Sequence, residues 1–301
     1  MRYTMLAAAM FFMTVSFAGE KKLKIVCTSY PVGLIAGQLE ESVLEKAEII
    51  TVAPNDTGCL HNFELKPEDI EKLNSADIIV YADENYDKAF EKYLQETKIE
   101  KYRLVKPLRF CLPHDPHFFS SFYGMQGIVE DWIDFMITKL PDEKDKLLEG
   151  KKIFKEYKME YKSKELEGKK VILLHHSLFN YASDMGFVIL GTILDSNGNE
   201  QSPEVIAQLI QKAREEKVDA VLADMMLYKG IPMPNPPNPI ATNIAKELNV
   251  PVISLNSLIH PPFYIMPLMF MPNSHLYTLQ RTFGYNLMTI KHALSPEKII
   301  E

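Results

Sequence analysis

The sequence predicts an α/β protein in which short strands and longer helices alternate along the chain. Short apolar segments recur between amphipathic segments from residue 24 to residue 255. Pro31, Pro67 and Pro203 each stand at the first turn of such an amphipathic segment, where the missing N–H is tolerated. Alternation at this spacing indicates βαβ units and mainly parallel sheets. The length of 301 residues and the 47% hydrophobic content suffice for two ordinary domains or one large one.

The first half of the chain contains four expected strands, at residues 24–28, 48–52, 76–82 and 102–105. Helices are expected at residues 31–40, 66–74, 85–96 and 121–140, and Pro141 ends the last of them. Turn chemistry at residues 55–58 leads into His61. Residues 143–167 are rich in Lys and Glu, and Gly168 suits the end of a helix there. This segment is interpreted either as a surface helix within one domain or as a helix that joins two lobes.

A second βαβ set follows, with expected strands at residues 170–174, 187–193, 218–223 and 251–255. Helices are expected at residues 203–215, with Ser202 as the cap, and at residues 241–248 and 277–293. Residues 231–239 contain five prolines and are expected to form a stiff, irregular rim. The expected division is a signal peptide at 1–18, an N-terminal lobe at 19–140, a connecting helix at 141–168 and a C-terminal lobe at 169–301.

The N-terminus has the pattern of a secretory signal. Arg2 supplies a positive start, an apolar run follows to Phe17, and small residues precede a cut after Ala18. The run is shorter than the ~20 residues of a membrane span, and no Cys follows the cut. We therefore expect an exported, periplasmic and soluble protein without a lipid anchor. The formal net charge of −7 and the lack of a basic run argue against nucleic acid or an anionic membrane as partner.

Histidines follow expected strands in both halves of the chain. His61 and the pair His114 and His117 lie after strands of the first half, and the pair His175 and His176 directly follows a strand of the second. In parallel sheets, ligands bind beyond the carboxyl ends of the strands, and neutral imidazole is the commonest metal ligand. This is the pattern expected if a divalent metal is held in a cleft between two lobes, although isolated histidines are more often surface or core residues than ligands.

Three motifs together resemble the zinc/manganese solute-binding proteins of ABC importers. These motifs are Gly58-Cys59-Leu60-His61-Asn62-Phe63, Asp115-Pro116-His117-Phe118-Phe119 and His176-Ser177-Leu178-Phe179-Asn180-Tyr181. The resemblance covers nearly all of the chain after the signal. It implies two α/β lobes joined by a rigid helix, with the metal between them, and docking onto a membrane permease that imports the ion. We expect a monomer.

The resemblance implies that the ligands are His61, His117 and His176. His176 is preferred to His175 because it stands three residues before Phe179 and five before Tyr181, as the family motif requires. His175 is interpreted as a packing residue at a strand end. His114 is not a family ligand, and it is a candidate for lining the entrance.

The sequence departs from the family at the fourth ligand, where Asn256 replaces the usual Asp. Neutral ligands alone leave the +2 charge of the ion uncompensated in a partly desolvated cleft. Asn256 is retained as a weak fourth ligand, and Asp224 as a fourth ligand or as a carboxylate that orients an imidazole. The other candidates are a water or anion, His260, and the thiolate of Cys59, although Cys59 could also pair with Cys111 in a disulfide.

Three imidazoles favour Zn²⁺ over Mn²⁺, which prefers oxygen ligands. The expected function is therefore a high-affinity binding receptor for zinc, without enzymatic activity. Two alternatives stay open. Three histidines with an open position could support hydrolysis by a zinc-bound water, or the protein could be a two-lobe binding protein that no longer binds metal. The third cysteine, Cys27, lies in an apolar run and is expected to be a buried thiol.

Overall fold

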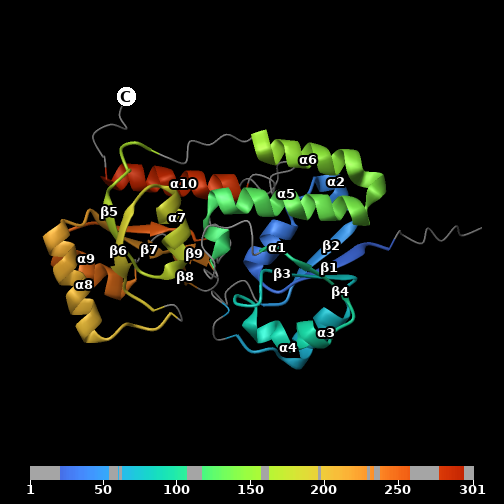
Figure 1. Ribbon diagram of the computed structural model, residues 1–301, viewed down its shortest axis with the longest axis horizontal. Coiled ribbons are helices and arrows are strands. Elements are labelled where there is room, and N and C mark those ends of the chain that lie inside the picture. Colours follow the sequence, from blue (N-terminus) through green and yellow to red (C-terminus); the bar gives the residue numbers. More distant parts are fainter. Residues whose placement is uncertain are drawn as a thin grey trace, which may run out of the picture.

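The computed structural model describes residues 21–53, 60, 63–106, 117–156, 163–195, 198–228, 231–233, 238–257 and 278–294. Two four-stranded parallel sheets form the centres of two lobes, and helices cover both faces of each sheet (Figure 1). The predicted α/β class with two mainly parallel sheets is confirmed. Within the described residues, no helix has both the length and the hydropathy needed to cross a membrane.

The N-terminal lobe has the strand order β2-β1-β3-β4. The strands are β1 (Leu23–Cys27), β2 (Ala47–Thr51), β3 (Ile78–Tyr81) and β4 (Glu100–Arg103). The helices are α1 (Tyr30–Ala36), α2 (Glu41–Leu44), α3 (Pro67–Asn74), the 3-10 helix η2 (Lys88–Phe90) and α4 (Glu91–Glu96). Each expected strand of this half is present. Ile25, Val26 and Cys27 of β1 are fully buried because this central strand has helices on both faces.

Two helices of this lobe differ from the expectation. The first ends at Ala36 and not near residue 40, with Gly37 as its cap. The helix expected from residue 85 starts only at Lys88, as a 3-10 turn. Two carboxylates account for the later start of the helix. Asp83 accepts hydrogen bonds from the N–H groups of residues 85 and 86, and Asp87 accepts hydrogen bonds from the N–H groups of residues 82 and 83. These bonds favour a turn over a helix.

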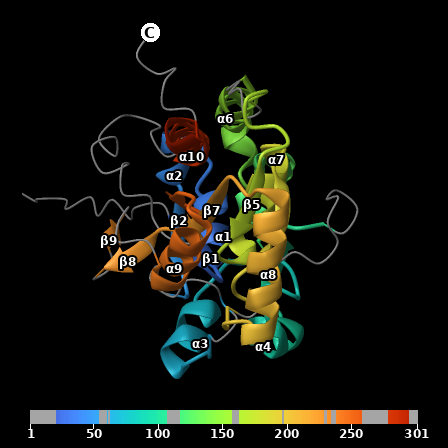
Figure 2. The ribbon, with the colours of Figure 1, turned by 90° about the vertical axis from the view of Figure 1, so that its left-hand side faces the viewer.

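The C-terminal lobe has the strand order β10-β7-β5-β6. Read from β6, this is the order of the first lobe, because in both lobes the first strand lies between the second and the third. The strands are β5 (Lys170–Leu173), β6 (Val188–Thr192), β7 (Ala220–Asp224) and β10 (Val252–Leu255). The helices are η5 (His176–Leu178), α7 (Phe179–Asp184), α8 (Pro203–Glu216), α9 (Pro239–Leu248) and α10 (Thr278–Leu294). Ser202 caps α8 as expected, accepting the N–H of Val205 at 3.4 Å. Helices α8 and α9 lie on the outer face of the sheet (Figure 2).

Part of the proline-rich segment is more regular than expected. Strands β8 (Met226–Tyr228) and β9 (Ile231–Met233) form an antiparallel hairpin that the sequence did not predict. Pro232 lies opposite Leu227 in this two-stranded ribbon. Proline is tolerated there because a two-stranded ribbon has only edge strands.

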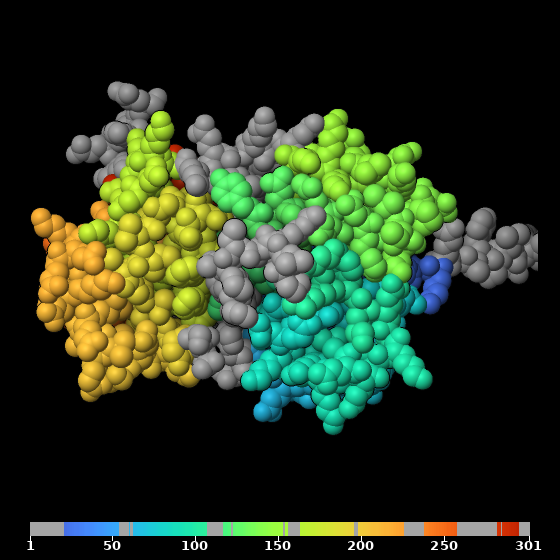
Figure 3. Space-filling model, in the orientation of Figure 1, coloured from blue at the N-terminus to red at the C-terminus, as the bar shows by residue number. Residues whose placement is uncertain are grey.

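A helical hairpin follows the first sheet. It consists of α5 (Phe122–Lys139), the 3-10 turn η4 (Pro141–Glu143) and α6 (Lys144–Glu156). The hairpin lies along the N-terminal lobe, in green in Figure 3. The expectation of one helix to residue 167 was wrong, because residues 164–168 form a turn that buries Leu166 completely. Gly168 adopts φ +79° and donates its N–H to the carbonyl of Gly186, which leads the chain into β5.

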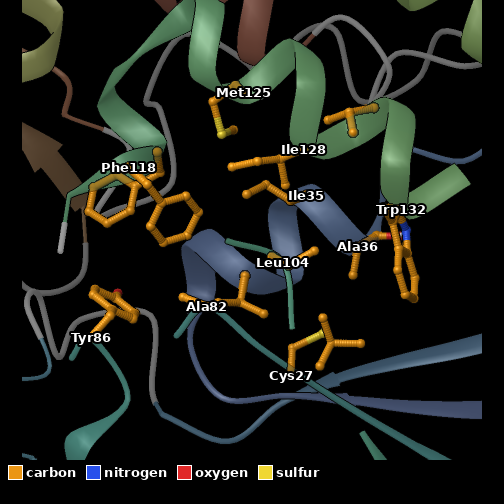
Figure 4. Packing of buried hydrophobic residues seen from close by; sticks show 14 of the residues in the cluster. Cys27, Ile35, Ala36, Ala82, Tyr86, Leu104, Phe118, Met125, Ile128 and Trp132 are labelled. Atoms are coloured by element: carbon orange, nitrogen blue, oxygen red, sulfur yellow. The ribbon is translucent and has the colours of Figure 1, made fainter. Parts of the chain in front are cut away.

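One continuous apolar core joins the two lobes. Its buried members come from β1, β3 and α5 of the first lobe and from β5, β7, β10, α7 and α10 of the second. Figure 4 shows Ile35 and Ala36 of α1 facing Ile128 and Trp132 of α5. The Trp132 indole N–H donates to the Ala36 carbonyl at 2.9 Å. Since the same cluster includes residues of both lobes, and α7 packs against α5 and the 3-10 helix η3 (Phe118–Ser120), the lobes are held together by packed side chains as well as by the connecting chain.

Candidate metal centre

The carboxyl ends of three adjacent strands gather polar side chains at one edge of the second sheet. His175 lies two residues beyond β5, Asp224 ends β7, and Asn256 follows β10. Strand β7 pairs with both β5 and β10, and Asp224 lies opposite Leu255. Parallel pairing therefore brings these three residues to the same edge.

His117 comes to this edge from the N-terminal lobe. It precedes the 3-10 helix η3 (Phe118–Ser120), and its side chain is almost completely buried. Its ring contacts Phe119 with centroids 5.8 Å apart. Tyr86 in turn packs edge-on against Phe118 and Phe119. This aromatic cluster packs against η3, which directly follows His117.

The structure brings His117 and His175 together across the two lobes. Their ring centroids are 5.0 Å apart and their planes are nearly perpendicular, at 85°. Two imidazoles that bind one tetrahedral Zn²⁺ through bonds of about 2.1 Å have ring centroids about 5 Å apart. The observed separation is compatible with a shared ion, and it also lies within the ordinary range of edge-to-face ring contacts.

His176 takes a different position. Its half-buried ring stacks on Phe179, with centroids 5.1 Å apart and planes within 17°. The structure therefore brings His175, and not His176, next to His117. The motif count from Phe179 favoured His176 as the ligand, and which of the two histidines binds an ion stays a prediction. His175 directly follows the buried run 171–174, which places it at the edge of the sheet.

Asp224 is linked to His175 through Ser177. The Ser177 hydroxyl lies 2.8 and 2.7 Å from the two carboxylate oxygens of Asp224, and it donates its proton to this carboxylate. The backbone N–H of Ser177 donates to Nδ1 of His175 at 3.3 Å. Ser177 is fully buried, so this chain of contacts anchors the imidazole and brings a negative charge close to it. Sequence reasoning did not single out Ser177.

Asn256 is buried and is held by the last helix. Its backbone N–H donates to Oδ1 of Asn286 at 3.0 Å, and its carbonyl accepts from Nδ2 of Asn286 at 2.8 Å. Asn286 lies on α10 and is also buried. The Asn286 side-chain amide thus fixes the backbone of Asn256. The sequence alone gave no signal for this role of Asn286.

Several predicted residues lie outside the described residues, so their roles stay predictions. They are His61, Cys59, Cys111, His114 and His260. The two described neighbours of His61 are well packed, since Leu60 is buried and Phe63 stacks on Phe90 with centroids 5.6 Å apart. Within the described part of the chain, no group of three or more His, Cys, Asp and Glu side chains could hold an ion.

Two ionisable groups are buried near the same edge of the first sheet. Cys27 is a free, buried thiol, as expected, and burial raises its pKa well above the ordinary value. Asp87 is fully buried, and burial raises its pKa to about 7. Its carboxylate accepts the N–H groups of Ala82 at 2.6 Å and Asp83 at 3.2 Å, just beyond β3.

The chain is similar to known proteins along most of its length. A family model described as "zinc-uptake complex component A periplasmic" (ZnuA) matches residues 25–262. The metal ABC transporter substrate-binding lipoprotein FimA of Streptococcus parasanguinis is 23% identical over 261 residues, covering 79% of this chain and 80% of that protein. An uncharacterized protein of Rickettsia prowazekii is 28% identical over 138 residues, 45% of this chain and 44% of that one.

The fold is also found among solved structures. The solute-binding protein FpvC of Pseudomonas aeruginosa, in complex with Mn²⁺, superposes with a TM-score of 0.71 at 16% identity. The match covers 92% of this chain and 99% of that one. At this identity the likeness concerns the fold.

Proposed function

The chain belongs to the family of the zinc-uptake component A, and from this membership we propose that it is an exported receptor for a divalent metal ion, zinc in the first place. In this proposal the protein binds one ion between its lobes and delivers it to the permease of an ABC importer. It acts as a monomer that releases the ion unchanged, and it catalyses no reaction.

The contact between His117 and His175 carries this proposal. Two nearly buried imidazoles from different lobes lie with ring centroids 5.0 Å apart, at the carboxyl ends of parallel strands. Burial removes water that would compete for the ion, and nitrogen ligands suit zinc. In the proposed site, His61 and Asn256 complete the coordination, and His175 takes the place first assigned to His176.

Asp224 supplies the negative charge that the proposed ligands lack. Its carboxylate accepts the Ser177 hydroxyl, whose own backbone N–H contacts His175. The Ser177 N–H fixes the orientation of the His175 ring through Nδ1, and the Asp224 carboxylate lies one residue contact away from that ring. This arrangement supports the proposal that Asp224 assists from outside the coordination sphere, while Asn256 contributes a neutral oxygen.

The choice of zinc rests on ligand chemistry. Three imidazoles favour zinc over manganese, which is better served by carboxylates and water. The fold relative FpvC was solved with Mn²⁺, and the family description names zinc. Since imidazoles also bind copper and nickel, the ion is proposed from the ligands together with the family.

We propose export by the N-terminal signal and retention in the periplasm without a lipid anchor. The relative FimA is described as a lipoprotein. The first cysteine of this chain is Cys27, which is fully buried in the central strand β1. Attachment of a lipid there would disrupt the core of the first lobe.

Elemental analysis of protein purified from its native compartment tests the proposal. One equivalent of zinc per chain is expected, with manganese, copper and nickel at trace levels. Titration of the metal-free protein with zinc and with manganese, each in competition with a chromophoric chelator, should then give tighter binding for zinc. Protein that carries no divalent ion and binds none in titration would reject the receptor function.

A further inference from the structure

We propose that Asn180 is a positioning residue that holds the two imidazoles of His117 and His175 at the separation that an ion needs. This inference rests on the proposed metal-receptor function and adds to it. The contact that carries it joins the two lobes, and it involves a side chain outside the predicted ligand set.

The side-chain amide of Asn180 is buried and donates across the lobe boundary. Its Nδ2 lies 3.1 Å from the backbone carbonyl oxygen of His117. Asn180 is 7% exposed and His117 is 1% exposed, so water competes little for this bond. The same carbonyl also accepts the N–H of Ser120 at 3.0 Å and the Ser120 hydroxyl at 2.9 Å.

The helical segment that carries Asn180 also carries His175 at its start. His175 precedes η5, and α7 follows η5 without a break. His175 and Asn180 therefore belong to one rigid segment. The His175 imidazole of this segment would be one ligand. The Asn180 amide of the same segment donates a hydrogen bond to the backbone of the other ligand, His117.

A second hydrogen bond joins the start of α5 to α7, four residues beyond Asn180. The Ser121 hydroxyl, at the start of α5, donates to Oδ2 of Asp184 at 2.9 Å. Ser121 also accepts the N–H of Gly124 as the cap of α5. The loop that holds His117 is thus attached to α7 on both sides of η3. The Asn180 bond is the one made directly to the candidate ligand.

Loss of the Asn180 amide should change binding more than folding. The His117 carbonyl keeps its two bonds from Ser120, so the buried acceptor stays satisfied and the fold should tolerate the change. A metal site, by contrast, requires distances within about 0.2 Å of the ideal. Partners outside the coordination sphere are typically worth about 10- to 100-fold in affinity.

The test compares two variants at Asn180 with a matched control. N180L removes the amide at similar size, and N180A removes it without adding a charge, which provides a second variant if N180L does not fold. Q38L is the control, because the buried Gln38 amide also donates to a backbone carbonyl, that of Leu34 at 3.0 Å. Gln38 lies just beyond the end of α1, away from the His117 and His175 segments.

Three quantities are measured on each protein: the zinc Kd by chelator competition, the visible absorption spectrum of the Co²⁺ form, and the Tm without metal. We expect the folded Asn180 variants to bind zinc about 10- to 100-fold more weakly, with altered Co²⁺ bands. Q38L should keep the wild-type Kd and spectrum, even if its Tm falls.

Asn180 variants that fold and show wild-type Kd values and Co²⁺ spectra would overturn the inference, because Asn180 would then matter only for packing. An equal loss of affinity in Q38L would overturn it as well, since the effect would then be a general one. Wild-type protein that binds neither ion would give a separate signal. It would reject the receptor function itself, and the Asn180 inference with it.

Discussion

The assignment of the C-terminal imidazole can be decided by comparing His175→Ala with His176→Ala. The two residues are adjacent in sequence but occupy different environments. His175 is 6% exposed and lies against His117, whereas the half-buried His176 stacks on Phe179. The pair is closely matched, because each variant removes one imidazole from the same loop.

The expected magnitudes follow from these environments. Loss of a partner that only orients a ligand already costs about 10- to 100-fold in affinity. Loss of His175 itself should therefore weaken zinc binding by more than about 100-fold, or about 2.7 kcal/mol. His176→Ala should change the free energy of binding by no more than about 0.5 kcal/mol, roughly twofold, because the His176 ring stacks on Phe179.

The assay is competition of each metal-free variant with a chromophoric zinc chelator at constant pH and ionic strength. Far-ultraviolet circular dichroism of the same samples checks that each variant is folded. A large loss of affinity in His176→Ala, with little change in His175→Ala, would refute the reasoning from the ring contact. It would restore the ligand assignment that the motif spacing gave.

Three further predictions concern other residues of the lobes. His117→Ala should weaken zinc binding by more than about 100-fold, and calorimetry that finds an unchanged Kd would reject His117 as a ligand. Asn256→Asp should tighten zinc binding by about tenfold or more, because it supplies the missing negative charge; weaker binding would show that this side chain does not face the ion. Asp87→Asn concerns stability. Because burial raises the pKa of Asp87 from 3.8 to about 7, its contribution to folding is full below pH 3.8 and is lost as pH rises through 7. Between pH 5 and pH 8, the wild type should therefore lose roughly 2–3 kcal/mol more stability than Asp87→Asn. Urea titrations at both pH values measure this, and equal losses in the two proteins would contradict it.

Local sequence signals predicted most of the fold. The expected strands at residues 24–28 and 48–52 appear as β1 and β2, because apolar runs between turns have few alternatives in an α/β chain. Pro67, and Pro203 with its cap Ser202, mark helix starts within a few residues. Each signal acts over a few residues along the chain, which is why it can be read without knowing the neighbours in space.

Other features were missed because they depend on contacts between distant segments. The charged pattern of residues 143–167 suited one long helix, but it could not reveal that Leu166 is buried in a turn. Likewise, no residue near Asp87 in sequence indicates that its carboxylate is fully buried. Burial of this kind is decided by which segments pack together.

The sequence by itself determined the alternation of strands and helices, the position of histidines after strands, and the family motifs. Only the tertiary structure decided which of the two adjacent histidines meets His117, and which amides hold the backbones of His117 and Asn256. The physical reason is the range of the interactions. Hydrophobic periodicity and capping are local, whereas a shared ion and a hydrogen bond between lobes require residues some 60 positions apart, such as His117 and Asn180, to lie within a few ångströms.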